Sequence, residues 1–275
     1  LNYNAANNNI VRNYFVDDEI NGVQDSELDV WDGFFDIGDP NRQVQQIAIN
    51  YDLPLNKIPT LNFLKTTYSY TGDYQWQKGS DLFGNLTLDG QTYDLGNSIS
   101  NANTHNVNSV LDMQKFYRYL GLTKFNKNSD SKAVRGFSNN NQTKKINPIL
   151  KSLIDLITTV KRIQINYSEN NGSYLPGFME TPGFIGSFTP SFGYVFGSQK
   201  DIRYLAARNG WLTVFPEFNQ QFSSTNNTNL TFAANLIPIK DLKIDLTGGR
   251  TYAENITESF NALDTDNDGF SDVYN

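Results

Sequence analysis

The sequence predicts an all-β fold, and three observations lead to it. Several segments alternate apolar and polar residues with a period of two, as a strand between two different environments does. Aromatic residues make up 13% of the 275-residue chain and charged residues only 19%. The sequence contains no run of eighteen apolar residues, so it predicts no transmembrane helix. Two classes remain: a soluble β-rich protein, or a transmembrane β-barrel, in which alternation hides the hydrophobicity from average scales.

The composition argues against several function classes. The net charge of -7 disfavours a nucleic-acid partner, because phosphate binding needs a basic face. The chain has no cysteine, which excludes disulfides, thiolate catalysis and cysteine-ligated zinc, and His105 is its single histidine. No nucleotide-binding or hydrolase motif is present, so we expect no enzyme. Leu1 is not an initiator residue and no signal peptide precedes it, so we expect a processed or truncated N-terminus.

The clearest strand covers residues 64–77. Its even positions are mostly aromatic, and its odd positions are all polar. At ~3.3 Å per residue and a tilt of ~40°, a strand of this length spans roughly 30 Å, close to the hydrocarbon thickness of a bilayer. The even-face side chains would then face lipid or a partner, and the odd-face side chains would face water. The aromatic residues in question are Tyr68, Tyr70, Tyr74 and Trp76.

Residues 1–43 are rich in Asn and Asp, and we expect an acidic loop there. Part of this loop spaces its oxygen-bearing side chains as the first nine positions of a calcium loop do, with Gly22 at the sharp turn. The residues that would bind the ion are Asp17, Glu19, Asn21 and Asp25. An acidic surface turn explains the same residues equally well.

Residues 44–119 are predicted to hold strands of the sheet and one long external loop. A strand over 44–55 is followed by a short turn at 54–57, which forms a hairpin with the strand over 64–77. A long polar connection over 78–104 contains Gly-Asn and Asp-Gly turn signals. A third strand is expected from about 106 to 119.

Residues 120–225 are predicted to hold a helix, one strand and glycine-rich insertions. Asn147 and Pro148 suit the start of an amphipathic helix over 147–160, which is too short to span a bilayer. A strand is expected over 162–168. The Gly-, Pro- and Phe-rich residues 172–197 would bind a partner, fold into a lumen or cap a core. A short helix over 201–208 would end at Asn209 and Gly210.

Residues 226–254 are predicted to form a second hairpin, with strands over 227–236 and 242–252 and a turn at 238–241. Both predicted hairpins have short turns, whereas the connection over 78–104 is long. Short turns at one end and long loops at the other are typical of transmembrane barrels.

Residues 255–275 form a second acidic loop. The pattern D-x-D-x-D-G-x-x-D predicts a calcium site, and Asn275 stands where an EF-hand has its bidentate Glu. The expected ligands are Asp264, Asp266, Asp268 and Asp272. The missing carboxylate would weaken the affinity, which suits the high calcium concentration outside cells. A solvated acidic turn is the alternative.

Six predicted strands are too few to close a transmembrane barrel, which needs at least eight. Open strand edges are not tolerated in hydrocarbon. The chain is therefore expected to be part of a larger barrel, or else its strands form a soluble sandwich.

Five strings of the sequence stand out, in order: NGVQDSELDVWDG (21–33), NYDLPLNKIP (50–59), GQTYDLGN (90–97), NTH (103–105) and FGYVFGSQKDI (192–202). They resemble the SprA/Sov family, the outer-membrane translocon of the type 9 secretion system. The resemblance covers about residues 17–260 and includes Asn41, Arg42, the strand over 64–77 and the helix region. Residues 261–275 resemble the family less well.

The resemblance implies that residues 1–275 are one segment of a very large transmembrane antiparallel β-barrel with long inserted loops and one short amphipathic helix. Such a barrel passes folded cargo proteins, including gliding adhesins, to the surface of a bacterium through its outer membrane. The implied partners are a PorV-like barrel at a lateral opening and a plug protein. Two alternatives are another outer-membrane porin or transporter, and a soluble, calcium-stabilised β-sandwich adhesin.

Overall fold

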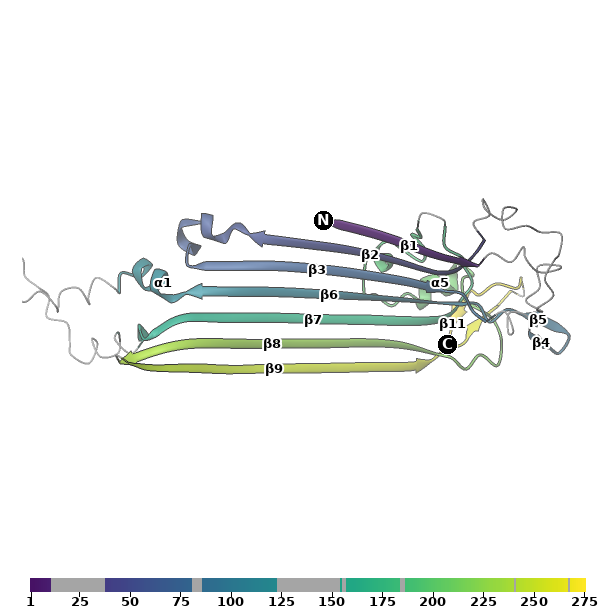
Figure 1. Cartoon of the computed structure of the whole chain (residues 1–275). Helices are drawn as coiled ribbons and strands as arrows, with labels where there is room; N and C mark the ends of the chain where they lie inside the picture. The colour runs from purple at the N-terminus through teal and green to yellow at the C-terminus, as the bar shows by residue number, and fades with distance from the viewer. Residues whose placement is uncertain are drawn as a thin grey trace, which may run out of the picture.

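The computed structural model describes residues 1–10, 38–80, 86–122, 154, 157–183, 186–239, 241–266 and 268–275. One antiparallel sheet of seven long strands dominates these residues, in the order β1-β2-β3-β6-β7-β8-β9. The strands lie side by side along their whole length (Figure 1). The all-β class and the large antiparallel sheet are thereby confirmed. Within the described residues, β1 and β9 are edges and the sheet does not close.

The seven strands are long, and each is hydrogen-bonded to its neighbours in the sheet order. They are β1 (Asn2–Ile10), β2 (Asp39–Leu53), β3 (Leu64–Gln77), β6 (Asn97–Asp112), β7 (Val160–Phe178), β8 (Gln221–Ile239) and β9 (Leu242–Ser259). Two small hairpins are formed by β4 (Leu86–Leu88) with β5 (Gln91–Tyr93), and by β10 (Ala262–Leu263) with β11 (Val273–Tyr274).

The helices are short and lie in the connections between strands. They are the 3-10 helices η2 (Pro54–Lys57) and η3 (Pro59–Leu61), and the α-helices α1 (Met113–Tyr119), α4 (Phe192–Val195) and α5 (Arg203–Arg208). None of the helices among the described residues is both long and apolar enough to cross a membrane.

The predicted strand over 64–77 coincides with β3, and the strands over 44–55, 227–236 and 242–252 correspond to β2, β8 and β9. The strand expected over 162–168 is longer, because β7 continues to Phe178 through residues that were assigned to an insertion. A strand that was not predicted, β1, lies in the Asn-rich N-terminal segment. Helix α5 begins at Arg203, two residues later than predicted, and it ends as predicted, with Gly210 following at a φ of 71°.

The strand predicted over 106–119 was wrong at both ends. β6 begins at Asn97, so the preceding connection is shorter than expected, and it contains the β4–β5 hairpin with its turn at Asp89 and Gly90. β6 ends at Asp112, and α1 follows. The Asp112 carboxylate accepts a hydrogen bond from the Lys115 backbone N–H at 3.2 Å and caps the helix.

Two predictions lie partly outside the described residues. Of the acidic loop predicted over 1–43, residues 11–37, with Asp17, Glu19, Asn21 and Asp25, lie outside them, whereas residues 2–10 and 39–43 belong to strands β1 and β2 and not to a loop. Of the helix predicted over 147–160, residues 154 and 157 are described as helical, and Val160 already begins β7.

The expected contrast between short turns and long loops holds only in part. The connections at 54–63 and 240–241 are short and lie at one end of the sheet, and α1 lies at that end too (Figure 1). The connection from β6 to β7, residues 113–159, is long and belongs to the same end. All three connections at the opposite end, residues 11–38, 78–96 and 179–220, are long.

The pairing register gives the sheet two different faces, because directly opposed residues share a face. We call the face that carries the odd positions of β3 the polar face, and the face that carries its even positions the mixed face. The residues between β7 and β8, 179–220, fold over one end of the mixed face, and we call them the covering segment. The buried core lies between the two and includes Tyr74, Trp76, Ile99, Leu175, Phe178, Tyr194, Ala206 and Leu212.

Candidate functional site

The polar face consists almost entirely of small, neutral, hydrogen-bonding side chains. In the three middle rows from β3 to β9, every residue is Asn, Ser, Thr, Ala or Gly. The rows are Thr71–Thr104–Asn170–Asn227–Ala253, Ser69–Asn106–Ser168–Asn229–Thr251 and Thr67–Asn108–Asn166–Thr231–Gly249. Charged residues of this face lie toward the strand ends, for example Arg42 and Asp73 at one end and Asp112 and Asp245 at the other.

These polar side chains hydrogen-bond to one another across the strands. Thr104 donates to Asn170 at 2.9 Å, Asn166 donates to Thr231 at 3.4 Å, and Thr251 donates to Asn229 at 3.3 Å. Such ladders stabilise a sheet without apolar contacts on that face. They also leave many acceptors and donors directed at the space above the sheet, which suits contact with water.

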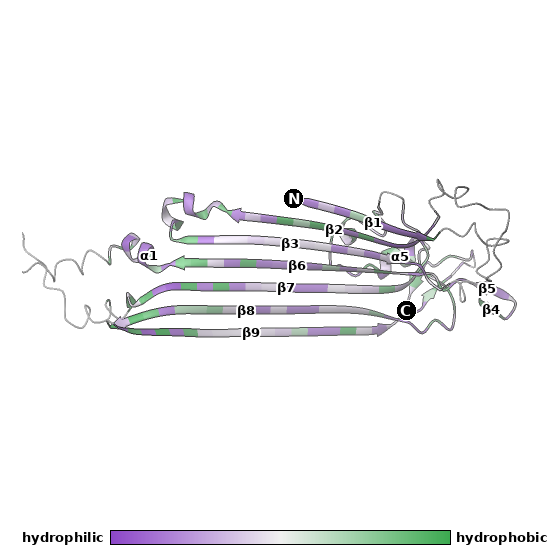
Figure 2. Cartoon of the chain, in the orientation of Figure 1, coloured by the Kyte–Doolittle hydropathy of each residue, from purple (hydrophilic) through white to green (hydrophobic). Residues whose placement is uncertain are grey.

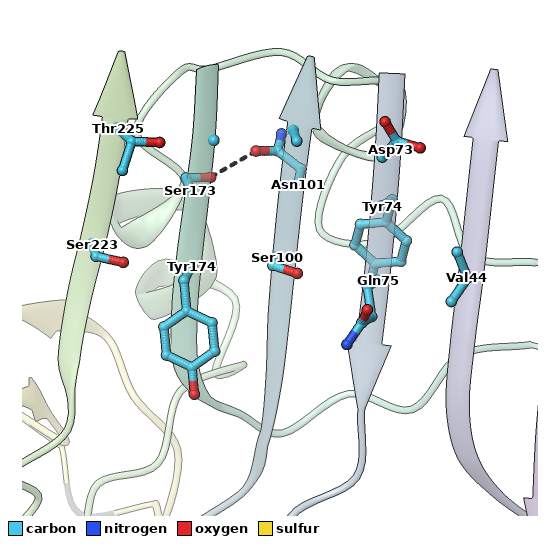
Figure 3. Close-up of a pocket in the computed structure, with 12 residues that line it drawn as sticks. Val44, Asp73, Tyr74, Gln75, Ser100, Asn101, Ser173, Tyr174, Ser223 and Thr225 are labelled. Carbon is cyan, nitrogen blue, oxygen red and sulfur yellow. Dashed lines mark hydrogen bonds between the residues drawn. The ribbon is translucent and has the colours of Figure 1, made fainter. Parts of the chain in front are cut away.

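An open hollow of about 470 Å³ lies on the polar face near the covered end (Figure 3). It forms where Ala102 and Gly172 are directly opposed, because neither side chain fills the space. Asp73 and Gln75 lie on one side of the hollow and Tyr174 lies on another (Figure 3). The hollow offers hydrogen-bonding groups. The single histidine, His105, is not among them, because it lies on the opposite face, with its Nδ1 2.8 Å from the hydroxyl of Tyr68.

The mixed face has an exposed apolar part at the end away from the covering segment, which we call the apolar band. In Figure 2, green segments, which mark hydrophobic residues, recur on the strands toward this end. Phe232 is 43% exposed and Leu246 53% exposed, so large apolar side chains are left uncovered. The band comprises Tyr51, Leu53, Leu64, Tyr68, Val107, Leu111, Ile163, Ile165, Tyr167, Leu230, Phe232, Ala234, Leu236, Leu242, Ile244 and Leu246.

The few polar residues of the band are accommodated locally. The hydroxyls of Thr66 and Ser109 lie 3.0 Å apart and hydrogen-bond to each other, and Thr66 is buried. Arg250 is opposite Leu230, in the last row of the band, where a long side chain can extend its charge beyond the band. Gly248 lies under the ring of Phe232, since a Cβ atom there would be 2.5 Å from the ring.

A polar row separates the apolar band from the covered end. It runs through Tyr70, His105, Glu169, Thr228 and Tyr252. Glu169 accepts hydrogen bonds from the Tyr167 hydroxyl at 2.6 Å and from Asn171 at 2.9 Å. The mixed face therefore changes from apolar to polar within one or two residues along each of these strands.

The covering segment is held on the mixed face through its backbone carbonyls. Polar side chains of β2, β3 and β6 donate hydrogen bonds to them, so the sheet binds the segment much as a receptor binds a peptide backbone. The pairs are Gln43 to Gly183, Gln45 to Ser187, Tyr70 to Phe196, Tyr74 to Thr189, Trp76 to Glu180, Asn101 to Tyr194 and Ser198, and Asn103 to Gly197.

This covering corrects one prediction. Tyr74 and Trp76 were expected to face lipid or a partner, but each is only 1% exposed because the covering segment packs on them. Of the three roles considered for residues 172–197, capping a core describes residues 179–183 and 186–197. Residues 172–178 belong to β7.

Arg203 joins the covering segment to the end of β9 and to the C-terminal hairpin. Its guanidinium lies 2.7 Å from carboxylate oxygens of both Asp201 and Glu258, and 4.2 Å and 5.0 Å from the ring centres of Phe222 and Tyr274. Burial acts to lower the pKa of Arg203, but the hydrogen bonds to both carboxylates outweigh it and raise the pKa. Burial likewise acts to raise the pKa of Asp201, and Arg203 outweighs it and lowers the pKa.

The structure brings three of the four predicted calcium ligands of the C-terminal loop together. Carboxylate oxygens of Asp264, Asp266 and Asp268 all lie within 4.8 Å of one another. Oxygen ligands followed by Gly269 in a tight turn fit the preferences of calcium. Desolvation, followed by the charges of Asp268 and Asp272, raises the pKa of Asp266.

Asp272, the fourth predicted ligand, has a different partner. Its Oδ2 accepts hydrogen bonds from the Thr265 backbone N–H at 2.9 Å and hydroxyl at 2.6 Å, and these bonds lower the pKa of Asp272. It therefore closes the loop. The preceding residue, Ser271, attaches this loop to the covering segment, because its hydroxyl donates to the Ala207 carbonyl and accepts from the Leu212 N–H.

Comparison of the chain with protein-family models and with curated proteins gives no match in either case. The covering segment and its carbonyl-binding side chains were not identified from the sequence. One signal was present: Gln43, Gln45, Asn101 and Asn103 are polar residues at alternate positions that otherwise carry apolar residues in the same strands.

Proposed function

We propose that this chain is part of the wall of a transmembrane β-barrel in a bacterial outer membrane. Its apolar band would face lipid and its polar face would line an aqueous path. One observation carries the proposal: one face of the sheet is polar across all seven strands, while the other carries an exposed apolar band. A sheet with water on both sides would leave this band exposed at a considerable cost.

The height of the band fits a bilayer. On β9 it extends from Leu242 to the boundary residue Tyr252. Ten residues at ~3.3 Å each, tilted by ~40°, rise ~25 Å along the membrane normal, which is the height of the apolar band of outer-membrane barrels. Tyrosines at the boundary, such as Tyr70, Tyr167 and Tyr252, correspond to the aromatic girdle of such barrels.

The two edge strands support a wall larger than this chain. Among the described residues, β1 and β9 each pair on one side only. β9 is eighteen residues long and has no proline or bulge to protect its free edge. Because unpaired backbone groups are not tolerated in hydrocarbon, further strands must continue the wall on both sides if the band is in lipid.

As for the activity, we propose a protein-conducting translocon of the type 9 secretion system, as the resemblance to the SprA/Sov family implies. The wall would pass folded cargo proteins, including gliding adhesins, to the cell surface with a PorV-like barrel and a plug protein as partners. A passage for folded proteins must be wet and weakly adhesive. The neutral Asn, Ser and Thr rows of the polar face meet both needs, because they bind water and offer no large charged or apolar patch to a cargo.

A substrate-specific porin or transporter is the second candidate, since its wall would have the same two faces. Co-purification separates the two. A translocon is expected to retain a PorV-like barrel and folded secreted proteins after mild detergent extraction, and a porin is expected to retain neither. Recovery of the complete protein without such partners would contradict the translocon proposal.

The C-terminal loop is proposed to bind calcium through Asp264, Asp266 and Asp268. When bound, the ion would neutralise the mutual repulsion of these carboxylates. The loop would then hold Ser271 and the covering segment in a fixed relation. A soluble, calcium-stabilised adhesin would share this loop, but it would fold without detergent or lipid.

A further inference from the structure

One stretch of the covering segment is unusually apolar. Residues 181–199 contain no charged residue, although charged residues make up 19% of the whole chain. The same stretch contains four phenylalanines, one of which lies outside the described residues. The other three lie close together, and we call Phe188, Phe192 and Phe196 the Phe cluster.

The Phe cluster is turned away from the core. Phe188 and Phe192 are 65% and 66% exposed, and their rings stack at 5.9 Å with 17° between the planes. The ring of Phe192 lies 4.5 Å from that of Phe196. The hydrogen bonds from the sheet hold the backbone on either side, at Ser187, Thr189 and Tyr194, so the rings are presented from a firmly attached support.

The cluster lies beside the boundary of the apolar band. The Phe196 carbonyl accepts a hydrogen bond from the hydroxyl of Tyr70, a member of the boundary row. It also lies over Gly72, where a Cβ atom would be 2.5 Å away, so only glycine permits this approach. The ring of Tyr3, on the mixed face of β1, is 6.0 Å from that of Phe196.

From this placement we infer that the Phe cluster binds the lipid bilayer at the boundary between headgroups and acyl chains, and so fixes the depth of the wall. The inference rests on the proposed membrane position of the apolar band. Three observations favour lipid as the occupant: the stretch is uncharged, the rings are exposed, and the cluster adjoins the polar row that borders the apolar band on the same face. Aromatic rings are favoured at this depth, and the two exposed rings have a lower free energy there than in water.

The test measures the depth of single nitroxide labels in the complete protein of which this chain is proposed to be part, reconstituted into phosphatidylcholine vesicles. These 275 residues contain no cysteine, so each variant carries one label once any cysteine elsewhere in the complete protein is replaced by serine. Phe192→Cys and Phe188→Cys report on the cluster. Phe232→Cys reports on the apolar band, and Phe270→Cys, 62% exposed in the acidic loop, is the water-facing control. The readout is accessibility to lipid-soluble oxygen relative to a water-soluble nickel complex.

We expect an oxygen-to-nickel ratio several-fold higher at Phe192→Cys than at Phe270→Cys, and highest at Phe232→Cys. Phe188→Cys repeats the measurement if Phe192→Cys does not fold. A water-like ratio at both cluster positions, with a lipid-like ratio at Phe232→Cys, would overturn this inference and leave the membrane wall intact. Protection from both reagents at the cluster would overturn it too, in favour of a protein partner. A water-like ratio at Phe232→Cys would overturn the membrane wall itself.

Discussion

Replacing Phe232 by arginine should prevent or greatly weaken membrane insertion. Phe232 lies in the middle of the apolar band, with its ring over Gly248. An arginine on the lipid face near the bilayer midplane costs about 2–4 kcal/mol. Each 1.4 kcal/mol is a factor of ten in an equilibrium constant. The equilibrium constant for folding into the membrane should therefore fall by about 30- to 1,000-fold. The loss of the Phe232 packing on Gly248 adds to this cost.

Thr231→Arg is the matched control, because Thr231 is the adjacent residue on the polar face. Ile239→Arg is a second control, since Ile239 lies at the end of β8, where the cost of arginine falls to about 0–1 kcal/mol. The assay is urea-dependent folding of the complete protein into phosphatidylcholine vesicles, followed by the mobility of the folded form on gels.

We expect Thr231→Arg and Ile239→Arg to fold like the wild type, and Phe232→Arg to lose stability by the amount given. Equal tolerance at Phe232 and Thr231 would refute the lipid-facing assignment of the band. An equal cost at Phe232 and Ile239, together with folding of the wild type in the absence of lipid, would instead indicate a soluble sandwich.

Three further predictions concern the covered end and the acidic loop. Gly72→Val should destabilise the docked covering segment by about 1–3 kcal/mol, seen as faster proteolysis between β7 and β8. Gly172→Ala should not, because its Cβ would meet the Thr225 hydroxyl at 3.3 Å and the Asn101 carbonyl at 3.5 Å; equal proteolysis of the two variants would contradict the packing. Arg203→Met should lower the free energy of unfolding by about 1–2 kcal/mol; the cost stays modest because the two carboxylates that lose their partner are half-exposed and can rehydrate. An unchanged melting temperature would contradict a stabilising role of Arg203. Arg203 holds the pKa of Asp201 in the folded protein below its ordinary 3.8. The stability that this ion pair contributes should therefore be complete above about pH 4 and should be lost as the pH falls through the pKa of Asp201 in the folded protein. A covering segment that becomes more stable on acidification would contradict this direction. Asp266→Asn should abolish calcium binding in the millimolar to submillimolar range by calorimetry, and unchanged heats of binding would remove the proposed site.

The parts of the fold that the sequence predicts correctly are those in which two different environments leave a period-two pattern. β3 is the clearest example, because its aromatic and polar positions alternate from end to end. Helix α5 was recognisable from its end at Asn209 and Gly210, where the chain needs a positive φ.

The missed parts are strands with similar residues on both faces. β1 consists mainly of asparagine and alanine, which have low strand propensity, and it is held by its pairing with β2. The first half of β6 and the second half of β7 are polar or contain Gly and Pro, and only their neighbours fix them as strands. At α1 a signal was available, since Asp112 is a good helix cap, but the apolar alternation up to Tyr119 outweighed it.

The same reason explains the outcome at the candidate site. The polar face is predictable from local alternation alone. The covered end is not, because the partners of Gln43, Asn101 and Asn103 lie far away in the sequence, in residues 183–198. The acidic loop is local, and its three clustered carboxylates were accordingly found from spacing.

One face of the sheet is proposed to meet water and the other to meet lipid. The direct measurement is a single-cysteine scan of β8 from Thr228 to Leu236 in vesicles, with a membrane-impermeant, water-soluble thiol reagent added on both sides. We predict that labelling alternates, with Asn229, Thr231 and Ala233 labelled rapidly and Leu230 and Phe232 slowly. Uniform rapid labelling along the strand would contradict the account.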